Sequence, residues 1–300
     1  MLASIEDGQS SSGLLMGATK EGKTMPIYSV RDLTFASLVV CSVSAMAVAQ
    51  VPRIESRPCD QACDEFPATS RVRVEHGTQR PLIDGVGWVI GIPSKILLWD
   101  RRANNHEVSD ATVCEITNYL EHKNLNDTLV RVNQYAPGKE FQRLVNNKKI
   151  APGWRYTVGS LKWLEYTFVP GRLFGKDEYN PYTNSLYIYS DMPTVGLAEA
   201  AYAKDVSRRE RPGTYAAVQD LPLVAMWHET LATDEVLNYV SIRGSSEQIQ
   251  KVRHDLYARY GLETAGAVGQ VLPDGTGLFQ IVGAVSGHTA AALENRGMHR

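Results

Sequence analysis

The apolar residues of this chain form two continuous runs in its first third, at residues 33–48 and 85–99, and periodic segments after them. Helical spacing of apolar positions predicts helices over residues 110–123, 139–146, 193–208, 220–239 and 246–260. Short apolar or alternating stretches predict strands over residues 127–133 and 185–189. Many helices beside few strands indicate an α+β fold that is mainly helical, with a small sheet.

The run at residues 85–99 is apolar almost throughout, but glycines and a proline interrupt it. A membrane-spanning helix needs about 20 apolar residues, so this run is too short to predict a span. We expect it to pack in the core. Residues 154–174 carry aromatic and aliphatic side chains without a clean period, and the pattern predicts no particular conformation there.

The earlier run, at residues 33–48, has the features of a secretory signal peptide. A basic residue precedes it, and small residues at 47–49 suit cleavage before Gln50. The alternative is an N-terminal anchor that is not cleaved. The polar stretch ahead of the run suggests that translation starts at Met25 or Met16. The prediction is therefore an exported protein, in the periplasm or cell envelope if the source is bacterial.

Composition then suggests where domains begin and end. Residues 1–49 form the leader, and residues 50–80 are polar and aperiodic, as in a linker or flexible arm. We expect ordered structure from Pro81, with a folded domain over residues 81–261 and a Gly- and Ala-rich helical tail over residues 262–300.

Charge and cysteine content narrow the chemistry. The formal charge of the 300 residues is −2, and the basic residues are scattered, so we expect no nucleic-acid partner. Beyond the expected cleavage point stand Cys59, Cys63 and Cys114. Cys59 and Cys63 are spaced for a short disulfide loop, and a zinc site would need about four ligands.

Residues 197–205 read LAEAAYAKD, directly after the predicted strand at 185–189. A strand leading into a helix of this kind resembles the gluzincin metallopeptidases of the HtpX and CAAX-protease types, whose helix carries HExxH. In that motif two histidines four positions apart lie on one helical face and bind zinc, while the glutamate activates the bound water. Here Ala198 and Tyr202 stand at the histidine positions, and Glu199 keeps the glutamate position.

The resemblance extends to a later helix. Gluzincins take a third zinc ligand from a glutamate there, and residues 229–234, ETLATD, resemble that segment, with Glu229 as the ligand's counterpart and Asp234 after it. The resemblance thus implies a zincin-like core with degenerate metal positions at Ala198, Tyr202, Glu229 and Asp234. Zinc is not expected, because alanine has no donor atom and neutral tyrosine is a poor ligand.

Three functions follow as hypotheses. The first is a pseudo-peptidase without catalysis: an exported binding or scaffold protein that holds an extended peptide or protein. In gluzincins the strand before the helix lies beside the substrate, which implies substrate-binding roles for Ser185, Tyr187 and Tyr189 by strand addition. The second is an active hydrolase in which Glu199 is catalytic at a non-standard metal site with Glu229, Asp234 or His228. The third is a structural, membrane-associated envelope protein.

The tail bears on the third hypothesis. Residues 264–291 are rich in glycine and alanine, and Gly283 and Gly287 form a GxxxG unit that lets helices approach closely. Pro273 and Asp274 interrupt any single span. Two alternatives remain open for this segment: a short hairpin in peripheral contact with a membrane, or a helix pair in solution.

Overall fold

The computed structural model describes residues 71–297, apart from positions 79, 170, 175–176, 220 and 272–275. The expected signal peptide and its cleavage site, the start codon, Cys59, Cys63 and the break at Pro273 lie outside the described residues. Within them the chain is mostly helical with one small sheet, so the α+β class is confirmed.

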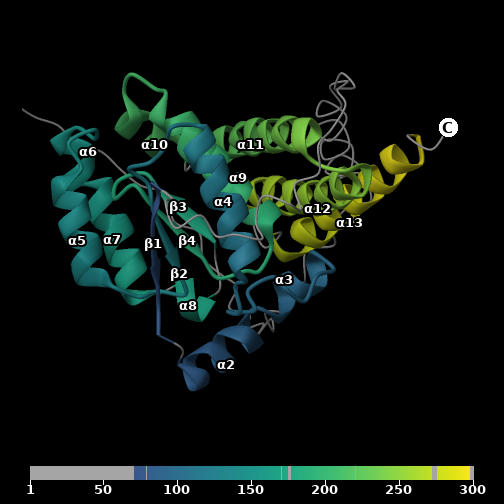
Figure 1. Ribbon diagram of the computed structural model, residues 1–300, viewed down its shortest axis with the longest axis horizontal. Coiled ribbons are helices and arrows are strands. Elements are labelled where there is room, and N and C mark those ends of the chain that lie inside the picture. Colours follow the sequence, from purple (N-terminus) through teal and green to yellow (C-terminus); the bar gives the residue numbers. More distant parts are fainter. Residues whose placement is uncertain are drawn as a thin grey trace, which may run out of the picture.

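Four strands form the sheet in the order β1-β2-β4-β3 (Figure 1). They are β1 (Arg73–His76), β2 (Leu129–Val132), β3 (Glu178–Asn180) and β4 (Ser185–Ile188). Strands β1, β2 and β4 run parallel, and β3 pairs with β4 as an antiparallel hairpin at one edge. Long crossovers that carry helices join the parallel strands, as parallel pairing requires.

Helices cover both faces of this sheet. They are α2 (Pro81–Ile90), α3 (Ile92–Leu97), α4 (Asp110–His122), α5 (Pro137–Asn146), α6 (Pro152–Tyr156), α7 (Val158–Phe168), α8 (Gly171–Phe174), α9 (Pro193–Ser207), α10 (Pro212–Gln219), α11 (Pro222–Arg243), α12 (Ser246–Val271) and α13 (Thr276–Gly297). In Figure 1, α5 and α7 lie on one side of the strands, and α4, α9 and α11 lie on the other.

The main core lies between the sheet and the layer formed by α4 and α9. Leu186 and Ile188 of β4 pack there with Ile116 and Leu197, all at most 1 % exposed. At Gly196 of α9 a Cβ would come within 2.2 Å of the Ile116 side chain. This close approach seats α9 against α4 and the sheet, and so fixes the position of the helix that carries Glu199.

The predicted elements have counterparts in the structure. Strands 127–133 and 185–189 appear as β2 and β4, and the helices predicted at 110–123, 139–146, 193–208 and 220–239 appear as α4, α5, α9 and α11. Ser109 caps α4, since its hydroxyl accepts a hydrogen bond from the Thr112 N–H at 3.3 Å. The helix predicted at 246–260 continues as α12 to Val271.

Two expectations are wrong. Ordered structure begins before Pro81, because Arg73–His76 pairs along its whole length with β2. The run at residues 85–99 does not pack in the core: it forms α2 and α3, whose apolar side chains are largely exposed. Apolar composition predicted burial here, whereas the fold leaves these two short helices at its periphery (Figure 1).

The C-terminal segment forms a close helix pair. A Cβ at Gly283 of α13 would lie 1.9 Å from the Gly261 oxygen of α12, and one at Gly287 would lie 1.9 Å from the Tyr257 oxygen. The GxxxG unit therefore makes the close approach expected of it. Over the described part of the chain, no helix is both long and apolar enough to cross a membrane.

Candidate functional site

Three of the four degenerate metal positions meet with Glu199 in one cavity of about 350 Å³. Ala198, Glu199 and Tyr202 of α9 line it together with Glu229 of α11. The four lie on two helices that pack against each other, so the tertiary structure brings the two sequence motifs together. Asp234 lies apart, in a neighbouring hollow that it shares with Tyr202.

An arginine lies between the two glutamates. Arg259 of α12 donates from Nη2 to Glu199 Oε1 and from Nη1 to Glu229 Oε2, both at 2.6 Å. Its side chain is 9 % exposed, against 12 % for Glu199 and 20 % for Glu229. A planar guanidinium presents its donors in a fork, so one cation serves both carboxylates with charge-assisted bonds.

Glu199 is held at both oxygens. Its Oε2 accepts the backbone N–H of Tyr179 at 3.0 Å, from the outer edge of β3. Burial raises the pKa of Glu199 to about 7, although the Arg259 charge acts to lower it, and the negative charge of Glu229 acts in the same direction as burial. The raised pKa reflects a carboxyl group removed from water, with one cation shared between two carboxylates.

Tyr202 fills part of the space beside Glu199. Its ring packs edge-to-face against Tyr179, with centroids 5.4 Å apart, and against His228 at 5.5 Å. His228 is 5 % exposed, and burial lowers its pKa. Its Nδ1 lies 3.6 Å from Asp205 Oδ2, while its Nε2 is buried without a hydrogen-bond partner.

These residues do not fit a zinc ion. Ala198 offers no donor atom, Tyr202 packs edge-to-face against Tyr179 and His228, and the Arg259 guanidinium lies between the two carboxylates that would bind a cation. Among the residues that the structure describes, no group of three or more His, Cys, Asp or Glu side chains has the geometry to hold a metal ion.

The strand predicted to bind substrate is not available for strand addition. β4 is internal, paired with β2 on one side and β3 on the other, and Ser185, Tyr187 and Tyr189 are at most 4 % exposed. The sequence identified a strand before the helix but not its place in the sheet. The edge strand beside β4 is β3, whose residues Glu178, Tyr179 and Asn180 line the cavity.

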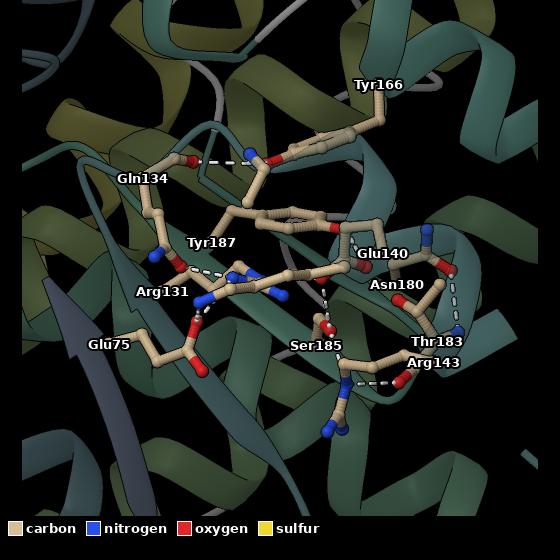
Figure 2. A network of polar contacts seen from close by, with 12 residues as sticks. Glu75, Arg131, Gln134, Glu140, Arg143, Tyr166, Asn180, Thr183, Ser185 and Tyr187 are labelled. Carbon is tan, nitrogen blue, oxygen red and sulfur yellow. Dashed lines mark hydrogen bonds and ion pairs between the residues drawn. The ribbon is translucent and has the colours of Figure 1, made fainter. Parts of the chain in front are cut away.

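Figure 2 shows where Ser185 and Tyr187 point instead. The Ser185 hydroxyl donates to Glu140 Oε1 at 3.0 Å, and the Tyr187 hydroxyl donates to Glu140 Oε2 at 2.7 Å. Glu140 of α5 is fully buried and forms an ion pair with Arg131 of β2, which is 1 % exposed. The Tyr187 ring also stacks on Tyr166 at 4.8 Å.

The network around Glu140 and Arg131 holds parts of the fold together. It joins the polar face of the sheet to α5 and α7, and a buried carboxylate needs such partners to offset its lost hydration. Glu75 of β1 adds a further ion pair to Arg131 at 2.8 Å. Substrate-binding roles for Ser185, Tyr187 and Tyr189 therefore find no support in their positions.

The residue that sequence reasoning missed is Arg259. It lies in the middle of α12, far along the chain from Glu199, and nothing in the local sequence distinguishes it from Arg253, the other arginine of that helix. A useful signal was the presence of two glutamates at the motif positions, since two carboxylates that share one cavity require a cation.

Comparison with known proteins gives no relative from which a family or function could be taken: no protein family, no curated protein and no solved structure matches this chain.

Proposed function

We propose that this chain is a non-catalytic, exported binding or scaffold protein with a zincin-like arrangement of helices, in which an arginine takes the electrostatic place of the metal ion. The observation that carries the proposal is the double ion pair of Arg259 with Glu199 and Glu229. On the gluzincin resemblance, these are the counterparts of the catalytic glutamate and of the third zinc ligand. A guanidinium compensates their charge, but unlike zinc it does not lower the pKa of a bound water to near 7.

The same contacts argue against Glu199 as a general base. One of its oxygens accepts from Arg259 and the other from Tyr179, which holds the carboxylate against α12 and β3. A hydrolase would need this group free to take a proton from a water molecule. The proposal therefore gives Glu199 a role in shaping the cavity.

The charge of the cavity suggests the ligand. Five carboxyl groups line it with two cations: Asp177, Glu178, Glu199, Glu229 and Glu263 with Lys162 and Arg259. Burial raises the pKa of Asp177 and of Glu199, so these two carry less negative charge than the other three. Such a cavity favours a cationic group, and the lysine or arginine side chain of a peptide has this chemistry. We take a basic peptide segment as the ligand class.

A metal assay tests the absence of catalysis. The purified full chain should contain far less than one zinc per molecule and should cleave no peptide, with or without added zinc. Stoichiometric zinc together with chelator-sensitive proteolysis would reject the proposal and favour the hydrolase hypothesis.

Restoring the missing ligands tests the zincin-like arrangement. The variant A198H/Y202H/R259A places two histidines on one face of α9 and removes the competing cation, so it should gain one zinc ion, with Glu229 as the third ligand. The matched control A198H/Y202H keeps Arg259 and should bind zinc far more weakly. A triple variant that folds, as judged by circular dichroism, yet binds no zinc would show that the arrangement is not zincin-like.

Peptide binding tests the ligand class. In fluorescence anisotropy, extended peptides that contain lysine or arginine should bind more tightly than acidic peptides of equal length, and added salt should weaken the binding. Equal affinity for both series would remove the basic peptide from the proposal.

A further inference from the structure

Helices α2 and α3 expose their apolar side chains and bury a glycine and a lysine, the reverse of ordinary surface helices. Gly87 is the buried residue of α2, and Lys95 is the buried residue of α3. Their aliphatic and aromatic side chains point the other way, toward solvent. A surface helix of a globular protein normally buries its apolar stripe and exposes its polar one, so this pair needs a partner of its own.

Specific contacts fix the polar side of the pair against the protein. Lys95 is 8 % exposed and donates to the Asn104 carbonyl at 3.0 Å and the Trp88 carbonyl at 3.2 Å. Asp84 of α2 forms an ion pair with Arg172 of α8 at 2.7 Å. A Cβ at Gly87 would come within 2.7 Å of the Arg172 carbonyl oxygen. These interactions hold α2 and α3 with their apolar sides outward.

The outward side consists of regular apolar stripes. On α2 it repeats at i, i+4 and i+7, and on α3 at i and i+4, with Trp99 two residues beyond the end of α3. The members and their exposed fractions are Leu82 87 %, Val86 51 % and Val89 58 % on the first stripe, and Ile92 37 %, Ile96 64 % and Trp99 68 % on the second. Trp88 adds a further ring at 44 %. We name these seven residues the α2–α3 face.

We propose that the α2–α3 face docks in the plane of an anionic lipid membrane. Residues 80–102 contain four basic and two acidic side chains, and the acidic ones, Asp84 and Asp100, are engaged by arginines. Arg80 and Arg101, at either end of this segment, are exposed. Exposed cations that flank an apolar face complement anionic headgroups, and tryptophan favours the headgroup level.

The position of α2 and α3 in the molecule leaves them accessible to a membrane. In Figure 1, α2 and α3 lie at its periphery, away from the sheet, and α2 protrudes. α8 packs against α2, and its Phe174 adds a ring that is 48 % exposed. With 10 and 6 residues, the two helices are too short to span a bilayer of about 30 Å, so they lie in the interface.

The α2–α3 face is a different surface from residues 264–291, where the sequence suggested a membrane contact. In that region Gly283 and Gly287 of α13 are buried against the backbone of α12. The two segments meet near His288 of α13, whose ring stacks on Trp99 at 4.2 Å and whose Nε2 lies 2.9 Å from the Leu97 carbonyl oxygen. The helix pair thus braces the α2–α3 face from behind.

The test uses the full chain with vesicles of phosphatidylcholine alone or mixed with phosphatidylglycerol. Hydrogen exchange of the backbone at residues 81–99 should slow on addition of the anionic vesicles. This readout is local, because binding of the N-terminal apolar run at 33–48 to the vesicles would not by itself protect residues 81–99. V86D/V89D changes two exposed side chains and should lower the partition of residues 81–99 onto the vesicles by about 100-fold. R80E/R101E should abolish the preference for anionic lipid.

The control is L161D/L293D, which charges two leucines of similar exposure, 65 % and 63 %, on α7 and α13. In this variant the anionic vesicles should slow hydrogen exchange at residues 81–99 as much as in the parent chain. The proposal is overturned if vesicles leave exchange at residues 81–99 unchanged, or if V86D/V89D is protected like the parent. It is also overturned if V86D/V89D converts a dimer into a monomer without any effect of lipid, because the face is then a protein interface.

Discussion

At the scale of single residues, Glu199 shows how a site changes character with its neighbours. The carboxyl group keeps the sequence position of a catalytic glutamate, yet a buried arginine and a backbone amide now engage both of its oxygens. Its raised pKa follows from burial together with the nearby Glu229 charge, which outweigh the single shared cation. A perturbed pKa here accompanies a structural contact, so it is no sufficient sign of catalysis.

This pKa predicts a pH dependence of stability. Because the folded pKa of about 7 lies above the ordinary 4.5, the folded chain retains a proton between these values that the unfolded chain has released. The contribution of Glu199 is thus fully present below pH 4.5 and is lost as the pH rises to 7. Glu199→Gln does not titrate, so its free energy of unfolding should gain about 3 kcal/mol relative to the parent over that window.

Urea denaturation at several pH values measures this difference. Glu263→Gln, which removes an exposed carboxylate at the same cavity, is the control and should track the parent. A constant difference between Glu199→Gln and the parent from pH 4.5 to 7 would contradict the assignment.

At the scale of elements, α12 and α13 show how two helices approach closely. Small residues at the crossing bring backbone against backbone, with Gly261 and Gly283 facing each other. The GxxxG spacing is familiar from membrane helices, but its physical content is close packing, which serves equally where no helix among the described residues spans a membrane.

The crossing predicts two different outcomes for two glycine substitutions. Gly283→Ala places a Cβ 1.9 Å from the Gly261 oxygen, so the backbones must separate, and the loss of stability should be about 1–3 kcal/mol or more. Gly266→Ala on α12 meets the end of the flexible Gln280 side chain at 3.1 Å and should cost far less. Thermal unfolding of both variants compares them, and equal shifts would show that the crossing is not tight.

At the scale of the whole molecule, the two faces of the sheet are built differently. The face toward α4 and α9 is apolar, with Leu186 and Ile188 in the main core. The face toward α5 and α7 contains the buried pair of Arg131 and Glu140 (Figure 2). This pair joins the two layers, since Arg131 comes from a central strand and Glu140 from the covering helix.

Removal of one partner should therefore weaken the whole fold. Arg131→Met leaves Glu140 buried without its cation, and we expect a loss of about 3–5 kcal/mol in the free energy of unfolding. The double variant R131M/E140Q removes both charges and should recover part of that loss. Denaturation of the parent and the two variants measures the effect, and a double variant less stable than R131M would contradict a charge imbalance as the cause.

Local sequence predicted the elements well because their signals are local. Periodicity located β2, β4, α4, α5, α9 and α11, and Ser109 marked the start of α4. The signals failed where position depends on distant partners. The sequence of β4 does not indicate whether the strand has a neighbour on both sides. The apolar composition of residues 85–99 does not indicate whether other parts of the protein cover them.

The sequence by itself determined the α+β class, the helix that carries Glu199 and the lack of donor atoms at Ala198, because these depend on side-chain chemistry and short-range spacing. Only the tertiary structure decided that Arg259 lies between Glu199 and Glu229, that β3 forms one edge of the sheet, and that the apolar side chains of α2 and α3 face outward. The physical reason is that charge compensation, strand order and exposure are relations between segments far apart in the chain, which packing brings together.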